Sequence, residues 1–75
     1  MTVRMNDLQR GQRGRVLSLE TEGNIRRRLL ELGLVPGTHI ERVMSSPGGD
    51  PACYRVRGAM IALRKLDATR ITVDV

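Results

Sequence analysis

Two side chains in this 75-residue sequence could ligate a soft metal or act as a nucleophile, His39 and Cys53. A metal site needs several converging ligands, and a reactive thiol needs a neighbouring base or cation that lowers its pKa. The chain has one histidine and one cysteine, so neither requirement is met by the sequence. We therefore expect an incidental strand histidine and an inert thiol, with no catalytic, metal-binding or cofactor-binding residues.

Patterns typical of other catalytic chemistry are also missing. The eight carboxylates are scattered singly, without the paired spacing that supports acid-base hydrolysis. The sequence contains no Gly-x-x-x-x-Gly-Lys-Ser/Thr run that would hold nucleotide phosphates. A chain of this length forms one domain with a thin core, which leaves no room for a deep substrate cavity. The sequence thus predicts a single binding domain over residues 1–75 and not an enzyme.

Arginine dominates the charged residues and gives the chain a formal net charge of +5. Such a charge favours acidic partners, which include nucleic acid, anionic lipid and acidic protein surfaces. Tyr54 is the only Phe, Tyr or Trp residue, so neither base stacking nor an aromatic groove for proline-rich peptides is expected. The run from Arg26 to Arg28 has three interpretations: solvated helix residues, a site for an acidic protein surface, or a site for nucleic acid.

Cysteine usage and hydropathy predict the cellular setting. A single cysteine cannot form an internal disulfide, and no apolar N-terminal run indicates a signal peptide. The longest apolar run, Ala59 to Leu63, is far shorter than the roughly 20 residues that span a bilayer. We expect a soluble protein in the reducing cytoplasm.

The segment from Asn24 to Gly37 predicts a helix, its end and a turn into a strand. Asn24 is the expected N-cap, and leucines recur at helical spacing up to Leu32. Gly33 supplies a left-handed position at the end of the helix, and Leu34 is the apolar residue that commonly follows such a cap. Pro36 and Gly37 then prevent the helix from continuing.

Helical periodicity assigns the faces of this predicted helix. At 100° per residue, Ile25, Leu29 and Leu32 form one buried seam, while Arg27 points away from it. Leu30 lies off the seam, so it either covers a neighbouring strand or is exposed for a partner. The residues predicted to be structural are Leu29, Leu32, Gly33, Pro36 and Gly37.

Alternation and turn residues predict five strands. The predicted strand at residues 38–44 contains Ile40 and Val43, which differ by an odd number and share one face only if a bulge intervenes. Asn6 or Asp7 is expected to cap a helical turn that ends at Gly11, and a second helical turn is expected at residues 64–69. The predicted strands are residues 14–19, 38–44, 54–57, 60–63 and 71–75, with a turn-rich loop at residues 45–51.

Arginines alternate with apolar residues in the third predicted strand. Tyr54 and Val56 share one face, and Arg55 and Arg57 share the other. Outward arginines concentrate charge, and one apolar anchor beside them suits a protein partner. We therefore predict a partner-binding surface composed of Arg27, Leu30, Arg55, Arg57 and Arg64.

Five short strands with one short helix after the first strand predict a mainly β fold, a small antiparallel barrel. Closure of a barrel removes exposed strand edges that a small sheet could not otherwise protect. SH3-like and OB-like barrels both fit these elements. The helix of an OB barrel typically follows its third strand, so the SH3-like arrangement is favoured.

The order of these motifs resembles the FeoA family of ferrous iron transport proteins over nearly the whole chain. No single motif is specific, but the collinear combination is. The resemblance rests on Leu8, Gly11, Gly14, Val16, Arg28-Leu29, Leu32 to Gly37, Gly48 to Pro51, Val56, Gly58, Ala62 to Arg64, Ala68 and Ile71.

The resemblance implies an SH3-like barrel that works beside FeoB, a membrane transporter with a cytosolic GTP-binding domain. It implies a cytosolic accessory protein, peripheral at the inner membrane through its partner, with the oligomeric state left open. The alternative is a small basic barrel that binds nucleic acid or serves as the regulatory module of an iron-dependent repressor, a class of protein to which the same domain type is appended.

Overall fold

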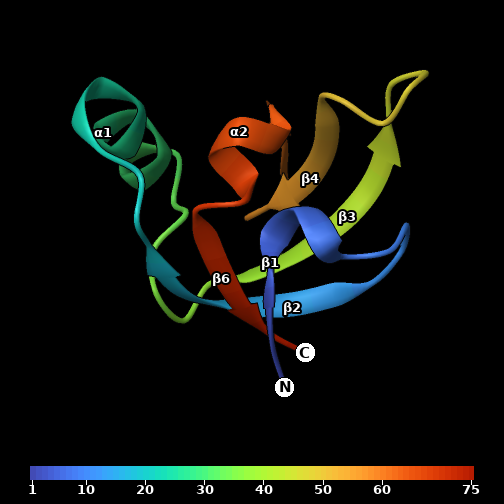
Figure 1. The fold of residues 1–75 in the computed structure, drawn as a ribbon. Helices are drawn as coiled ribbons and strands as arrows, with labels where there is room; N and C mark the ends of the chain where they lie inside the picture. Colours follow the sequence, from blue (N-terminus) through green and yellow to red (C-terminus); the bar gives the residue numbers. More distant parts are fainter.

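The strands of the computed structural model, which describes residues 1–75, form one antiparallel sheet that curls around a small core (Figure 1). The strand order is β1-β6-β2-β3-β4-β5, so β1 and β5 are each paired on one side only. The bounds are Thr2–Arg4 for β1, Arg13–Leu19 for β2, His39–Ser45 for β3, Ala52–Val56 for β4, Ala59–Leu63 for β5 and Ile71–Asp74 for β6.

Three short helical segments connect these strands. The 3-10 turn η1 (Met5–Asp7) follows β1, α1 (Gly23–Glu31) joins β2 to β3, and α2 (Lys65–Ala68) joins β5 to β6. Figure 1 shows α1 set to one side of the strands, whereas α2 lies among them. The expected helical turn at residues 64–69 is therefore confirmed. The expected cap at Asn6 or Asp7 is wrong, because η1 begins at Met5 and has no side-chain cap.

The five predicted strands are present, and a sixth was missed. The missed strand is β1, which pairs with β6 through Val3 opposite Val73. Three residues are too few to show a periodic pattern, and their pairing partner lies at the other end of the chain. The last strand was predicted to run to Val75, but β6 ends one residue earlier, at Asp74. Val75 lies outside the strand and is 38% exposed.

A bulge resolves the register of β3. The pairing of β3 with β4 shifts between Arg42 and Met44, where the expected irregularity falls. Ile40 is consequently buried and Val43 half-buried, although the two differ by an odd number.

The core lies inside the curled sheet and contains one large aromatic side chain. Tyr54 is fully buried, and its hydroxyl donates a long hydrogen bond of 3.4 Å to the carbonyl of Met5. Tyr54 and Val56 face inward on β4, and Ile61 and Leu63 do so on β5, as alternation predicts. The other core residues are Met5, Leu8, Val16, Leu19, Leu29, Leu34, Ile40, Ala52, Ala68, Ile71 and Val73.

The helix α1 departs from its predicted orientation. It begins at Gly23 after Glu22 and has no side-chain cap, so the expected N-cap role of Asn24 is wrong. Leu29 is buried as predicted, but Leu32 is 40% exposed. Leu30 packs partly against the core instead. The buried face of α1 is thus rotated toward Leu30, because the chain must carry Leu34 into the core directly after the helix ends.

Candidate docking groove

An apolar groove of about 450 Å³ lies between α1 and β5. Seven of its ten lining residues are hydrophobic, which distinguishes it from the other hollows of the surface. Leu32 at the helix end and Met60 on the strand are 40% and 45% exposed, so apolar surface is open to solvent there. The lining residues are Ile25, Arg28 and Leu29 of α1, Leu32 directly after it, Met60 to Leu63 of β5, Arg64 and Asp67.

The end of α1 is held by a Schellman motif, which fixes one wall of the groove. The amide of Leu34 donates to the carbonyl of Leu29 at 3.0 Å, and the amide of Gly33 donates to the carbonyl of Leu30 at 3.0 Å. Gly33 has the predicted positive φ, at +97°. The hydroxyl of Thr38 donates to the carbonyl of Gly33 at 3.0 Å and ties this cap to the start of β3.

The opposite wall reaches the same cap through Arg57. This residue lies in the tight turn between β4 and β5 with φ +51°, so its predicted place as an outward strand residue is wrong. A Cβ placed on Gly33 would lie 2.6 Å from Cδ of Arg57. The Arg57 side chain therefore runs over the helix end, where a cation is favoured by the helix dipole. Arg57 itself is not part of the groove lining.

Two arginines give the groove a positive rim. Arg28 from α1 and Arg64 after β5 line it, and neither forms an ion pair within the chain. Asp67 of α2 is the one carboxylate of the lining. An apolar floor with two unpaired guanidinium groups suits a partner that brings apolar side chains and a carboxylate.

The outer sheet face carries a second group of arginines. We define this face by Arg13, Arg15, His39, Glu41, Arg55 and Asp74. The strand register places Arg13, Glu41 and Arg55 in one row across β2, β3 and β4. Nε of Arg13 lies 3.6 Å from Oε1 of Glu41. Positive and negative charges thus alternate on this face.

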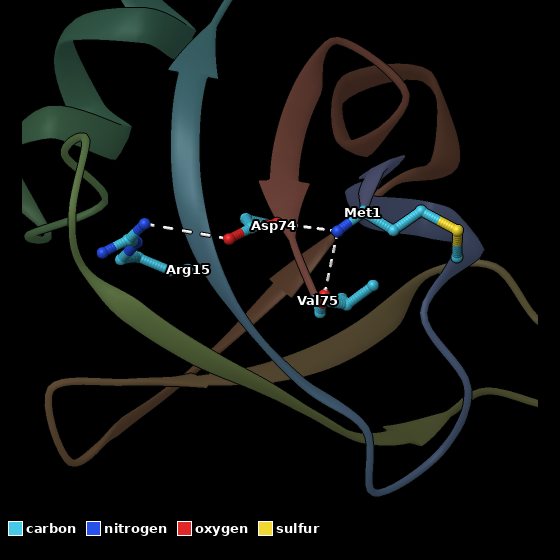
Figure 2. Close-up of polar contacts among 4 residues, drawn as sticks. All are labelled: Met1, Arg15, Asp74 and Val75. Carbon is cyan, nitrogen blue, oxygen red and sulfur yellow. Dashed lines mark hydrogen bonds and ion pairs between the residues drawn. The ribbon is translucent and has the colours of Figure 1, made fainter.

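The next row of the sheet has the same alternation (Figure 2). Arg15 lies opposite both Asp74 and His39, and its Nη2 is 3.7 Å from Oδ2 of Asp74. The amino group of Met1 donates to Oδ1 of Asp74 at 2.9 Å. The hydrogen bond and charge of this amino group, with a smaller contribution from Arg15, lower the pKa of Asp74 below its usual value. The carboxylate therefore stays ionised in mild acid.

The predicted partner-binding residues do not form one surface. Arg64 lines the groove. Arg55 and Arg57 border one shallow hollow at the edge of the outer sheet face, where Arg55 is paired with Met60 of β5, and the Arg57 side chain also runs over the helix cap. Arg27 is exposed on α1 but is not part of the groove lining, and Leu30 is half-buried against the core. Of the groove residues, Arg28 belongs to the arginine run for which an acidic protein surface was one interpretation, and Leu32 was predicted to be buried. Met60 and Ala62 were not singled out. The apolar run at residues 59–63 contains both of them, but the exposure of Leu32 depends on how α1 is seated.

A polar hollow beside Tyr54 has a structural explanation. The guanidinium of Arg42 donates to the carbonyls of Asn6 at 3.0 Å and Leu8 at 2.7 Å, which holds η1 and the residue that follows it. Burial raises the pKa of Tyr54; Arg42 opposes this rise, while the carboxylate of Asp50 adds to it. Arg42 and Tyr54 thus satisfy backbone carbonyls, whereas the buried Oδ1 of Asn6, which also lines this hollow, has no hydrogen-bond partner.

His39 and Cys53 lie on different strands and differ in exposure. His39 is exposed at the start of β3, and Cys53 is half-buried on β4. No group of three or more His, Cys, Asp or Glu side chains converges in the structure. No helix of the protein is long and apolar enough to cross a membrane.

The architecture and the groove define a small SH3-like β protein with an appended helix. The sequence model of the FeoA domain matches residues 3–75. The chain belongs to the FeoA family, which is linked to ferrous iron transport.

A curated relative joins this domain to a transporter in one polypeptide. The Fe(2+) transport protein A/Fe(2+) transporter FeoB fusion protein of Porphyromonas gingivalis is 34% identical over 73 residues. The match covers 97% of this chain but 9% of the relative, so the present chain corresponds to a small part of that protein.

Solved structures share the fold. The FeoA protein of Chlorobium tepidum has a TM-score of 0.93 at 34% identity, covering 97% of this chain and 70% of that one. The FeoA of Stenotrophomonas maltophilia has a TM-score of 0.81 at 36% identity, covering 99% of this chain and 89% of that one. It is described as a procaryotic SH3 domain protein complexed with zinc. The IdeR structure of T. acidophilum has a TM-score of 0.84 at 27% identity, covering 99% of this chain and 34% of that one.

Proposed function

We propose that this protein is a non-enzymatic accessory of bacterial ferrous iron uptake that docks on the cytosolic part of a FeoB-type GTPase transporter and modulates its activity. The observation that carries this proposal is the Porphyromonas gingivalis fusion protein, in which an FeoA segment 34% identical to this chain is covalently joined to FeoB. Covalent joining keeps two domains at high effective concentration, which benefits domains that act together. A separate chain of the same family must achieve this proximity through a binding surface.

The groove between α1 and β5 is the surface that we propose for this contact. It combines open apolar area at Leu32 and Met60 with the unpaired guanidinium groups of Arg28 and Arg64. Buried apolar anchors surrounded by arginine are typical of protein interfaces. Docking there would place the protein at the cytoplasmic face of the membrane.

A titration against the full-length transporter in lipid nanodiscs tests the proposal. We expect saturable binding by the native protein at physiological salt and a change in the GTP turnover of the transporter. Absence of binding to the intact transporter, with and without GTP, would overturn the proposed function.

The fold is shared by the IdeR structure and by manganese-dependent transcriptional repressors, so the alternative that we consider is a regulatory or nucleic-acid-binding domain. Binding to duplex DNA would weaken steeply as salt is raised, because each neutralised phosphate releases counterions. We expect no DNA binding tighter than about micromolar at physiological salt, which is the range of non-specific binding. Tighter binding would favour the alternative.

A further inference from the structure

The two edge strands of the sheet are protected to different degrees. β1 has three residues and ends in Arg4, whose guanidinium donates to the carbonyl of Thr69 at 3.1 Å. β5 has five residues, Ala-Met-Ile-Ala-Leu, without a charge, a proline or a register shift. Proteins normally protect a free edge by making it short, charged or bulged. β5 is of moderate length and has neither a charge nor a bulge, so its free edge is less protected than that of β1.

The turn before β5 determines which backbone groups face the free edge. Arg57 and Gly58 both have positive φ and form a two-residue hairpin turn, so Val56 and Ala59 are a hydrogen-bonded pair. Hydrogen-bonded and non-hydrogen-bonded pairs then alternate along the antiparallel ladder. Met60 and Ala62 fall in non-hydrogen-bonded pairs. Their N–H and C=O groups therefore point away from β4, and no other part of the chain bonds to them.

These free backbone groups lie along the apolar groove. A segment placed beside β5 would pair with Met60 and Ala62, and its side chains could enter the space lined by Ile25 and Leu32. A carboxylate at either end of that segment would meet Arg28 or Arg64, which have no ion-pair partner. Main-chain pairing supplies affinity in this mode of recognition, and the neighbouring pocket supplies specificity.

We propose that β5 accepts an extended segment of the transporter's cytosolic part as an additional strand, with apolar side chains toward α1 and a carboxylate near Arg28 or Arg64. This inference rests on the proposed function. A second copy of this chain is a less suitable occupant, because each chain carries a net charge of +5 and would bring the arginine rim of its own groove.

Two substitutions at one exposed position test the role of the backbone. Ala62→Pro removes the outward N–H, and proline is tolerated on an edge strand when its nitrogen faces solvent. Ala62→Val adds comparable bulk and keeps the N–H. We expect Ala62→Pro to weaken binding to the full-length transporter in nanodiscs at least tenfold, whereas Ala62→Val changes it less than threefold. Circular dichroism must show both variants folded.

Hydrogen exchange of the native protein provides a test that needs no variant. We expect the amides of residues 59–63 to exchange more slowly when the transporter is added, because the free N–H groups of Met60 and Ala62 become paired. If the native protein binds but segment 59–63 gains no protection, or folded Ala62→Pro binds like Ala62→Val, strand addition is wrong and the proposed function stands. If Ala62→Pro abolishes only self-association in sedimentation, β5 pairs with itself and the inference is also wrong. Failure of the native protein to bind the transporter would instead overturn the proposed function.

Discussion

The groove and the outer sheet face both carry arginine, but they use it differently. On the outer face, Arg13 lies 3.6 Å from Glu41 and Arg15 lies 3.7 Å from Asp74, so carboxylates neutralise part of the charge. In the groove, Arg28 and Arg64 are unpaired and border an apolar floor. Exposed ion pairs contribute little free energy, whereas desolvated apolar anchors dominate binding. Arginine alone therefore does not locate a docking surface in this protein.

The largest effect should distinguish two leucines that both line the groove, the buried Leu29 and the exposed Leu32. Leu29 is 1% exposed, so Leu29→Ala should lower the free energy of unfolding by roughly 2–5 kcal/mol through loss of packing and cavity formation. Leu32 is 40% exposed, so Leu32→Ala should cost about 1 kcal/mol or less. Urea denaturation measures both values. Equal losses would mean that Leu32 is packed in the core as Leu29 is and does not border an open groove.

The cap that joins the two walls of the groove should show the next largest effect. Gly33→Ala forces a side chain into left-handed backbone, and its Cβ, 2.6 Å from Cδ of Arg57, displaces that flexible side chain from the helix end. We therefore expect a loss of about 1 kcal/mol from the backbone and a further loss from the displaced contact. Gly37 has φ +93° but open space around it, so Gly37→Ala should cost about 1 kcal/mol. Thermal denaturation of both variants provides the comparison. A Gly37→Ala variant as unstable as Gly33→Ala would show that Arg57 does not pack on the cap.

Two neighbouring arginines on α1, one in the groove and one outside it, should differ in their effect on transporter binding. Arg28 lines the groove and Arg27 does not, although both side chains are exposed. Arg28→Glu should weaken transporter binding about tenfold, which corresponds to about 1.4 kcal/mol. Arg27→Glu should change affinity by about threefold or less, mainly through slower association and a flatter salt dependence. Surface plasmon resonance at two salt concentrations separates the two; a larger effect at Arg27 would shift the docking surface around the helix.

The smallest effect concerns the neutralised outer face. The pKa of Asp74 is lowered in the folded protein, so its contribution to stability is present above its usual pKa and is lost as pH falls through the lowered value. Because Asp74 is exposed, we expect a small change in the acid-unfolding midpoint of Asp74→Asn that disappears at high salt. Transporter binding should be unaffected. A clear binding defect in Asp74→Asn at neutral pH would implicate the outer face.

Local signals predicted much of the fold. Gly33 marked the helix end because only glycine adopts its φ without strain, and the odd spacing of Ile40 and Val43 indicated the bulge in β3. β1 and the positive φ of Arg57 were not predictable, since the first depends on a partner at the far end of the chain and the second on the geometry of a hairpin turn.

The residues of the groove were predicted less well than the fold. Leu30 was separated from the buried seam by helical periodicity, but α1 is seated with its Leu30 side toward the core and Leu32 outward. Periodicity fixes the relative positions of side chains on a helix and not the rotation of that helix against a sheet. A substitution such as Leu30→Asp would therefore disturb the core as well as any interface.

The most direct test of the central claim compares one residue from each surface in a calorimetric titration with the full-length transporter. Leu32→Asp places a charge in the groove at a position that the core does not need, and Arg55→Glu reverses a charge on the outer sheet face. With both variants folded, we predict that Leu32→Asp weakens binding about a hundredfold, the loss typical of an interface hot spot, while Arg55→Glu changes it by about threefold or less. Native-like binding by folded Leu32→Asp, together with a large loss in Arg55→Glu, would contradict docking through the groove.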